Sequence, residues 1–203
     1  MYRKYVEMGF TAEPFPEGTH MCLIYSNEEE RRNVISSFVE KGLKTGERVV
    51  YFSDAMSPDE DWLSATGMEL PELRNRKQFI LRNTESTYYP DGKFIPEAML
   101  KKLKDFYKNT IDENYMALRL SGEMSWATRG IPGVERLMEY EAKVNELLVK
   151  YPVTSICQYD ANKFNGSLIF ECLKVHPFMI VHGQIIRNPY YLHPDEYIRS
   201  ITG

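Results

Sequence analysis

The sequence is poor in cysteine and has no long apolar run. Its 203 residues include three cysteines, Cys22, Cys157 and Cys172. Such a sparse, odd set is not a disulfide framework and is typical of a reducing compartment. The opening residues, MYRKYVEMGF, contain no apolar core and are not a signal peptide. No stretch approaches the length of a membrane span. We therefore expect a cytoplasmic protein that has no membrane partner.

Excess positive charge is also absent. The chain has 25 Lys and Arg residues against 29 Asp and Glu, which gives a formal net charge of -4. This balance argues against nucleic acid as a direct partner, because binding to phosphates needs clustered cations. The length suits one α/β domain and is tight for two, so we expect a single domain over residues 1–203.

Glycine is missing from the stretch LIYSNEEERRN, residues 23–33, where an apolar strand gives way to a helix. In many strand–loop–helix folds this corner is glycine-rich and binds phosphate. Here Ser26 and Glu29 have the spacing of a capping box, and three acids follow the serine. The motif G-x-x-x-x-G-K-[ST] occurs nowhere in the chain. We therefore do not expect NTP hydrolysis, and we expect a non-enzymatic protein with no cofactor.

What the sequence does contain is a regular alternation of apolar strands and helices. Strands are predicted over 20–25, 48–53, 78–83, 116–123 and 153–160, with one or two more within 178–188. Helices are predicted to start at Ser26, Pro58, Pro96 and Pro132, and a short one covers 164–175. The tail after residue 188 is expected to be irregular, with at most one helical turn. The pattern predicts a three-layer α/β fold, a mainly parallel sheet with helices on both faces.

Ligands of open parallel sheets bind outside the carboxyl ends of the strands. Applying this rule to the predicted strands, and adding one histidine discussed below, selects the candidate ligand-binding residues Tyr25, Asp54, Glu123, Ser125, Trp126, Tyr159, Asp160 and His176. The set is rich in aromatic rings and carboxylates and poor in Lys and Arg. It therefore favours a small neutral or cationic ligand over a phosphate.

Each candidate also has a purely structural interpretation. Glu123 either faces the ligand or forms a cap or salt bridge, since strand-end acids in a crevice often have perturbed pKa values. Trp126 either stacks on a ligand or fills the core. Asp160 either belongs to the site or caps the helix near Phe164. Strand alternation places Tyr159 on one face of the sheet and Asp160 on the other.

Histidine and cysteine raise the question of a metal. His176 precedes a proline and either makes a structural hydrogen bond or belongs to the site, while His20 and His182 lie in strand-like runs and are expected to be structural. His20, Cys22, Cys157 and His176 were weighed as ligands. Soft-ligand sites usually show close pairs such as C-x₂-C, and none occurs here. We therefore expect no metal, although adjacent strands would bring Cys22 near Cys157.

Five stretches together resemble a known family. They are GTHMCLIYSNEEERRNVISSFVEKGLKTGERVVYFSD, RLSGEMSW, YEAKVNELL, ICQYD and HPFMIVHGQIIRNPYY. In order and spacing they resemble the MEDS domain, the methanogen/methylotroph DcmR sensory domain, from about Gly18 to about Tyr191. The resemblance implies a RecA/KaiC-like layout in which the phosphate loop, and with it the Walker A motif, has been lost.

The same resemblance implies a function. It predicts a non-enzymatic sensory domain of a signalling or transcription-regulation system, with a small molecule, such as a C1 compound or other hydrocarbon derivative, at the carboxyl edge of the sheet. The implied partner is a signalling protein such as a histidine kinase or a regulator, and a homo-oligomer is left open. Two alternatives remain: a nucleotide-binding relative of RecA/KaiC-like ATPases, and a ligand-free interaction scaffold whose crevice is filled by side chains such as Trp126 and Tyr159.

Overall fold

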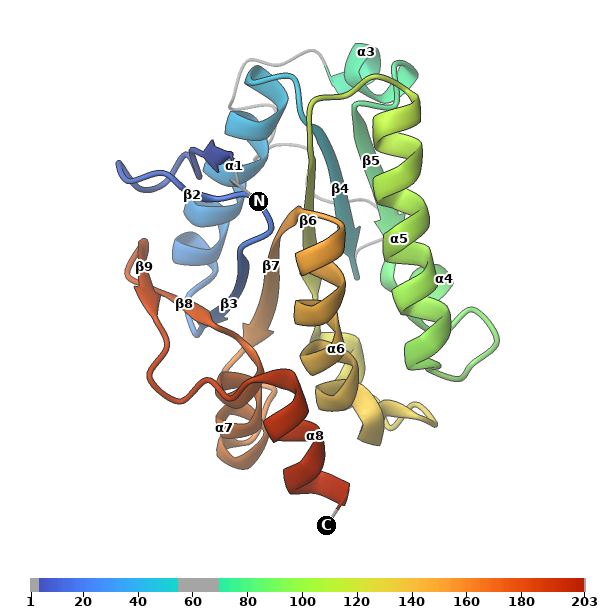
Figure 1. The fold of residues 1–203 in the computed structure, drawn as a ribbon, viewed down its shortest axis with the longest axis vertical. Coiled ribbons are helices and arrows are strands. Elements are labelled where there is room, and N and C mark those ends of the chain that lie inside the picture. The colour runs from blue at the N-terminus through green and yellow to red at the C-terminus, as the bar shows by residue number, and fades with distance from the viewer. Residues whose placement is uncertain (1–3, 55–69, 203) are drawn as a thin grey trace.

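The computed structural model describes residues 4–54 and 70–202, and its centre is a seven-stranded sheet (Figure 1). The strand order is β5-β4-β6-β7-β3-β8-β9. The first five strands of this order are all parallel: β5 (Phe79–Asn83) at the edge, then β4 (Arg48–Ser53), β6 (Leu118–Glu123), β7 (Val153–Asp160) and β3 (His20–Tyr25). β8 (Phe178–Val181) runs parallel to β3, and β9 (Gln184–Arg187) returns antiparallel to β8.

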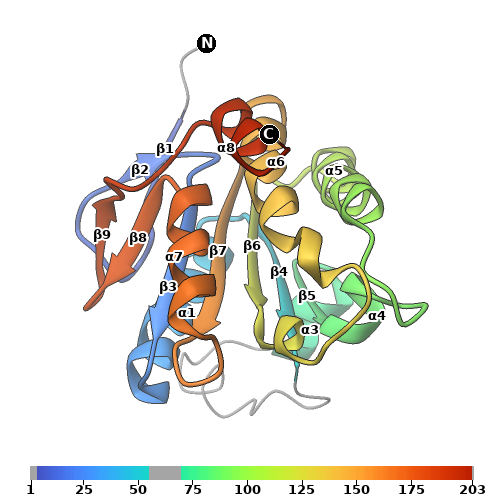
Figure 2. The same cartoon turned by 90° about the horizontal axis from the view of Figure 1, so that it is seen from below.

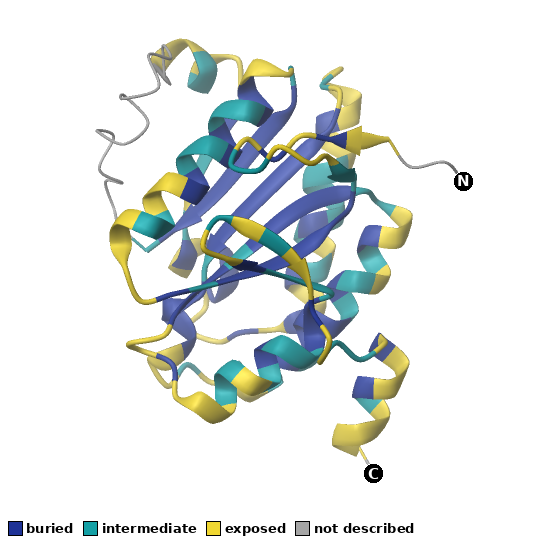
Figure 3. Cartoon of the chain, turned by 90° about the vertical axis from the view of Figure 1, so that its left-hand side faces the viewer, coloured by how far each residue is buried: buried dark blue, intermediate teal, exposed yellow. Residues whose placement is uncertain are grey.

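Helices cover both faces of this sheet (Figure 2), so the predicted three-layer α/β class is confirmed. One face packs against α1 (Glu28–Lys44) and the short α3 (Leu70–Asn75). The other packs against α5 (Pro96–Asp112), α6 (Leu137–Lys150) and α7 (Gly166–Val175), with the short α4 (Thr84–Tyr88) at one end. The inner strands are buried along most of their length because apolar layers enclose them on both sides (Figure 3).

The strand predictions for 20–25, 48–53 and 153–160 are confirmed to the residue, and β5 and β6 begin one and two residues later than predicted. Pro96 is the first residue of α5, as predicted. The helix expected from Pro132 begins instead as a 3-10 turn, Val134–Arg136, and continues as α6. The helix expected to start at Pro58 lies outside the described residues.

The structure differs from the sequence-based predictions at three other places. The tail is more helical than the single turn expected, because Pro194–Thr202 forms helix α8, which buries Tyr197. His182 is not in a strand: it lies in the β8–β9 turn at a φ of 48°. A small two-stranded sheet near the N-terminus, β1 (Tyr5–Val6) with β2 (Phe15–Pro16), was missed because each strand has only two residues.

Helix α1 begins one residue later than the sequence indicated. Asn27, not Ser26, is the N-cap, and its Oδ1 accepts the backbone N–H groups of Glu29 (2.7 Å) and Glu30 (3.4 Å). The predicted Ser26–Glu29 capping box was therefore wrong. Asparagine caps a helix as well as serine does, so the sequence alone could not decide which of the two residues is the N-cap. The acids Glu28–Glu30 do occupy the first turn, where their negative charges interact favourably with the helix dipole.

A buried ion pair joins the sheet to α1. Arg119 on β6 donates to both carboxylate oxygens of Glu47, with Nε at 2.8 Å and Nη2 at 2.7 Å. Both side chains are buried. The guanidinium also donates to the carbonyl of Phe38 in α1. A Cβ on Gly42 would lie 2.7 Å from Arg119 Cδ, so α1 can approach the pair only because residue 42 is glycine.

Removing the cap tests the start of α1. We expect Asn27→Ala to lower the free energy of unfolding by about 1 kcal/mol, because two N–H groups lose their acceptor. The matched control is Ser26→Ala, which should change stability by less than about 0.5 kcal/mol, as at an ordinary surface position. Urea unfolding followed by circular dichroism measures both. A larger loss of stability in Ser26→Ala than in Asn27→Ala would show instead that Ser26 caps the helix, as in the predicted capping box.

Breaking the buried pair should have a much larger effect. Glu47→Gln leaves the Arg119 charge buried and uncompensated, and we expect a loss of about 3–5 kcal/mol in urea unfolding. Asp105→Asn removes the exposed i,i+4 pair with Lys101 and should cost no more than about 1 kcal/mol. Equal losses in the two variants would show that burial does not control the strength of the Glu47 pair.

Candidate functional site

A polar network occupies the carboxyl edge of the sheet on the α1 face. Arg31 of α1 lies over the ring of Tyr25, with its Cζ 5.5 Å from the ring centroid. Its Nη1 donates to Tyr51 Oη and Gln158 Oε1, both at 3.1 Å, and to Glu123 Oε1 at 3.3 Å. One cation from the helix therefore links the ends of four strands.

The two carboxylates of this edge are held by protein donors. The Tyr51 hydroxyl and Arg31 donate to Glu123 Oε1, and the backbone N–H of Asp54 donates to Oε2 at 2.9 Å. Asp54 in turn accepts from the Thr84 hydroxyl and from Arg129 Nη2 at 2.6 Å. Burial raises the pKa of Tyr51, and the charge of Glu123 adds to this rise, so the phenol remains a donor. The structure thus brings the candidates Tyr25, Asp54 and Glu123 together, through Arg31.

Two predicted site residues lie apart from this network. Trp126 is fully buried, and its ring stacks on Tyr88 at a centroid distance of 4.8 Å and contacts Phe94 at 5.1 Å. Ser125 begins the same 3-10 turn and is also buried. Of the two interpretations of Trp126, the position of its ring agrees with the one in which it fills the core.

Asp160 closes its own turn at the end of β7. Its Oδ1 accepts from the backbone N–H of Asn162 at 2.9 Å, and its Oδ2 lies 3.5 Å from Lys163 Nζ. The alternative reading, that Asp160 caps the next helix, was wrong. The N-cap of α7 is Asn165, which accepts from the N–H of Leu168.

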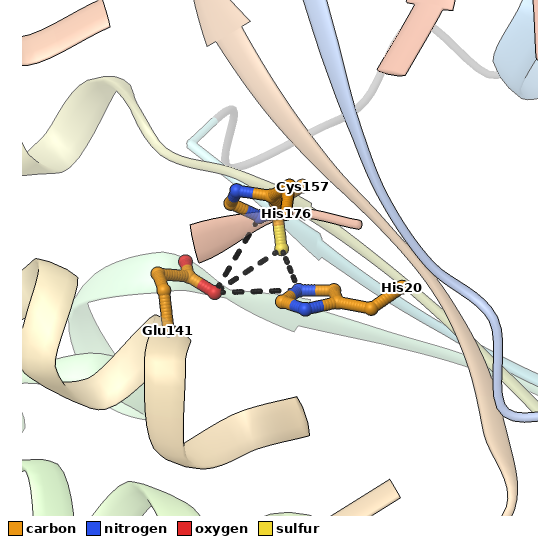
Figure 4. A group of neighbouring side chains, drawn as sticks. All are labelled: His20, Glu141, Cys157 and His176. Carbon is orange, nitrogen blue, oxygen red and sulfur yellow. Dashed lines mark hydrogen bonds and ion pairs between the residues drawn. The ribbon is translucent and has the colours of Figure 1, made fainter. Parts of the chain in front are cut away.

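Tyr159 and His176, the remaining candidates, lie on the opposite face of the sheet beside Glu141. Figure 4 shows the cluster that they adjoin: His20 from β3, Glu141 from α6, Cys157 from β7 and His176 from the segment before β8. Glu141 Oε2 lies 3.4 Å from His20 Nε2, 3.7 Å from Cys157 Sγ and 3.7 Å from His176 Nε2. His20 Nε2 lies 3.4 Å from Cys157 Sγ. We call these four residues the buried cluster.

Three further contacts orient the buried cluster from outside. His20 Nδ1 lies 3.0 Å from Asn145 Oδ1, and His176 Nδ1 lies 2.8 Å from the carbonyl oxygen of Cys172. The Tyr159 hydroxyl donates to Glu141 Oε1 at 3.0 Å. The strand alternation predicted for β7 is confirmed, because Cys157 and Tyr159 face α6.

Burial sets the protonation of the cluster. It lowers the pKa of His176 to about 3, with the neighbouring His20 adding to the shift, so His176 is neutral. Burial and the charge of Glu141 raise the pKa of the Cys157 thiol. Burial alone would also raise the pKa of Glu141, but its contacts with His20, His176 and the Tyr159 hydroxyl lower it overall. The carboxylate is therefore ionised inside the core, which requires a compensating positive charge.

A small cavity of about 20 Å³ adjoins the cluster. His20, Glu141 and Cys157 form its polar side. Its other walls are mostly apolar and come from the sheet and helices α4, α5 and α6, including Phe52, Tyr88, Leu103, Leu120, Tyr140, Val144 and Leu148. This volume holds about one water-sized molecule.

The sequence reasoning missed Glu141 and Arg31. A signal for Glu141 was present, because Leu137, Val144 and Leu148 lie four residues before it and three and seven after it, on one helical face. A charged residue inside such an apolar stripe marks a buried partner. Arg31 had no such signal, since it follows three acids in a polar first turn.

The fold and the layout of the site define the class of protein. The chain is similar to a KaiC-like protein from Pyrococcus horikoshii OT3, at a TM-score of 0.62 and 18% identity, covering 89% of this chain and 81% of that chain. It is also similar to the flagellar accessory protein FlaH from Methanocaldococcus jannaschii, at a TM-score of 0.58 and 11% identity, covering 91% and 84%. The fold is therefore RecA/KaiC-like.

Within this class the sequence itself identifies the family. The model of the MEDS domain, described as the methanogen/methylotroph, DcmR sensory domain, matches residues 19–177. The chain belongs to the MEDS family, as the resemblance predicted. It is therefore a sensory, regulatory type of domain.

One curated relative has a described role. The chain is 26% identical over 159 residues to the transcriptional repressor DcmR of Methylorubrum extorquens, covering 77% of this chain and 57% of the repressor. The chain thus spans little more than half the length of that relative. Among the described residues, every helix is too short or too polar to traverse a bilayer.

Removing one orienting contact tests how far the core depends on Glu141. Tyr159→Phe leaves Glu141 Oε1 without its donor, and we expect a loss of about 1.5–3 kcal/mol, the range for hydrogen bonds to buried charged groups. Tyr197→Phe is the control, since its hydroxyl donates to the half-exposed Glu171 and should cost about 0.5–1.5 kcal/mol. Thermal and urea unfolding give both values. If Tyr159→Phe did not change the free energy of unfolding, the charge of Glu141 would be compensated without the Tyr159 hydroxyl.

Proposed function

We propose that this chain is a non-enzymatic sensory domain of a signalling or transcription-regulation system, acting in the cytoplasm. Its signal is a small, largely apolar molecule that binds in the cavity between the sheet and α6. The observation that carries the proposal is the composition of that cavity, whose apolar walls meet three polar side chains, His20, Glu141 and Cys157. Ligand sites commonly combine apolar walls with a few placed polar groups.

The size of the cavity sets the class of ligand. A volume of about 20 Å³ admits a C1 compound or a short hydrocarbon derivative only with small shifts of the lining side chains. The apolar walls favour a methyl, methylene or halogen group, and the polar side favours a hydroxyl or amine. We propose this cavity in place of the carboxyl edge, because Glu123 and Asp54 there already hold protein donors.

A nucleotide is the weaker candidate. A phosphate at the start of α1 would need the backbone N–H groups of Glu29 and Glu30. These groups already donate to Asn27 Oδ1. Arg31, a cation near the start of α1, already donates to Glu28, Glu123 and Gln158. The Walker A motif is absent from the sequence.

The signal must reach a partner, and α6 offers the route. This helix carries Glu141 and Val144 against the cavity and packs on its outer side against α8. A ligand that shifts α6 therefore shifts the C-terminal helix. We propose that the output is a signalling protein or an additional regulatory domain, such as a histidine kinase or DNA-binding regulator, since the repressor relative is longer than the region matched here.

Binding in the cavity is tested by thermal shift with methanol, dichloromethane, methylamine and short alkanols, and with ATP and Mg²⁺ as a separate arm. We expect at least one small compound, and not ATP, to raise the melting temperature, because a ligand of the native state stabilises it by mass action. Val144→Leu adds a carbon to the cavity wall and should abolish the shift.

The control is Val149→Leu, the same change on an exposed position of the same helix, which should keep the shift. A shift retained in Val144→Leu would exclude this cavity as the binding place. A shift with ATP alone would replace the proposal with the nucleotide-binding alternative, and no shift with any compound would favour the interaction scaffold.

A further inference from the structure

We propose that His20, Glu141, Cys157 and His176 bind a divalent transition-metal ion, and that Zn²⁺ fits the four ligands best. This inference goes beyond the sensory function and replaces the expectation of no metal. The cluster offers two imidazole nitrogens, one thiolate and one carboxylate, all of them ligand types that Zn²⁺ accepts in proteins. Each comes from a different element, so sequence spacing gave no C-x₂-C signal.

The distances match a tetrahedral site. Ligand bonds of about 2.0–2.3 Å in a tetrahedron hold the ligand atoms roughly 3.3–3.8 Å apart. Four separations in the cluster are 3.4, 3.4, 3.7 and 3.7 Å, and all four ligand atoms lie within 4.8 Å of one another. Binding needs only shifts of a few tenths of an ångström to about one ångström.

The hydrogen bonds fix which atoms face the centre. Asn145 Nδ2 donates to the carbonyl of Val175 at 2.8 Å, so its Oδ1 must accept, and His20 Nδ1 therefore carries a proton. His176 Nδ1 also carries a proton, because it faces the carbonyl oxygen of Cys172. In the neutral ring of each histidine the lone pair is then on Nε2, which faces the cluster.

A proton cannot satisfy this arrangement as well as a metal can. Protonating His20 would let its Nε2 donate to Glu141 or Cys157, but it would add nothing for His176. His176 Nε2 is fully buried, has no hydrogen-bond partner among the described residues, and lies 3.7 Å from Glu141 Oε2. A buried nitrogen lone pair directed at a carboxylate calls for a cation between them.

The charges also balance. When the ion binds, the Cys157 thiol loses its proton to solvent and its sulfur becomes a thiolate ligand. One divalent ion, one thiolate and one carboxylate with two neutral imidazoles then form a centre of zero net charge. The outer contacts of both histidines and of Glu141, through Tyr159, are the kind that orient metal ligands.

A second group, Cys22, Cys172 and His176, is the weaker candidate. It provides three ligands rather than four. Its use of His176 would require Nδ1, the atom nearest Cys172 Sγ at 3.5 Å, and that nitrogen donates to the Cys172 carbonyl. Cys22 therefore serves as a control rather than as a ligand.

Metal binding is tested on the whole chain after chelator treatment, by native mass spectrometry with Zn²⁺ and by absorption spectroscopy with Co²⁺. We expect one ion per chain, and visible d–d bands of tetrahedral intensity together with a near-ultraviolet thiolate-to-cobalt band. Cys157→Ser should abolish the thiolate band and lower affinity at least about 100-fold, and Asn145→Ala should lower it about 10–100-fold. Cys22→Ser should leave the spectrum and affinity unchanged.

Sub-stoichiometric or absent binding, octahedral cobalt spectra, or loss of the band in Cys22→Ser instead of Cys157→Ser would overturn the proposal. Circular dichroism confirms that each variant is folded. If Cys157→Ser does not fold, the thiolate band of the wild-type protein decides, since its absence excludes Cys157 as a ligand. The result is separate from the small-molecule test, because a metal site can exist whether or not the cavity binds a ligand.

Discussion

The carboxylate of Glu141 is the constraint on which the core depends. It is fully buried on α6, where an isolated charge would carry a desolvation penalty of several kcal/mol. Its partners come from β3, β7 and the segment before β8. Meeting the charge therefore constrains how α6 lies across β3 and β7, and it explains why polar residues occupy the centre of an otherwise apolar layer. The same charge gives the adjoining cavity a polar side in addition to its apolar walls.

The two faces of the sheet divide the polar chemistry between them. On the α1 face, Arg31 and its acceptors close the edge where nucleotide-binding folds hold phosphate. On the α6 face, the polar groups lie deep between helix and sheet, and His176 Nε2 has no hydrogen-bond partner among the described residues. The absence of a Walker A motif from the sequence is thus accompanied by an edge whose polar groups pair with one another, and by a second polar centre on the other face.

Local sequence signals predicted the strands well because β3, β4, β6 and β7 carry runs of apolar residues, a pattern set by burial on both faces. Alternation along β7 also predicted which side chains face α6. The site was harder to predict, because Tyr159 and Glu123 lie at the ends of neighbouring strands yet on opposite faces of the sheet. The role of Glu141 depends on which strand α6 crosses, and the helix α8 depends on burial of Tyr197, so neither follows from local propensity.

The position of β3 also affects how the chain folds during synthesis. This strand is the first of the large sheet to be made, yet it lies between β7 and β8, and its His20 meets Cys157 across 137 residues of chain. Pairing between such distant segments is slow, because loop closure precedes any gain from contact. An apolar strand therefore emerges from the ribosome long before either neighbour exists. Until β7 and β8 are synthesised, both hydrogen-bonding edges of β3 lack their strand partners, which makes such an intermediate prone to aggregation.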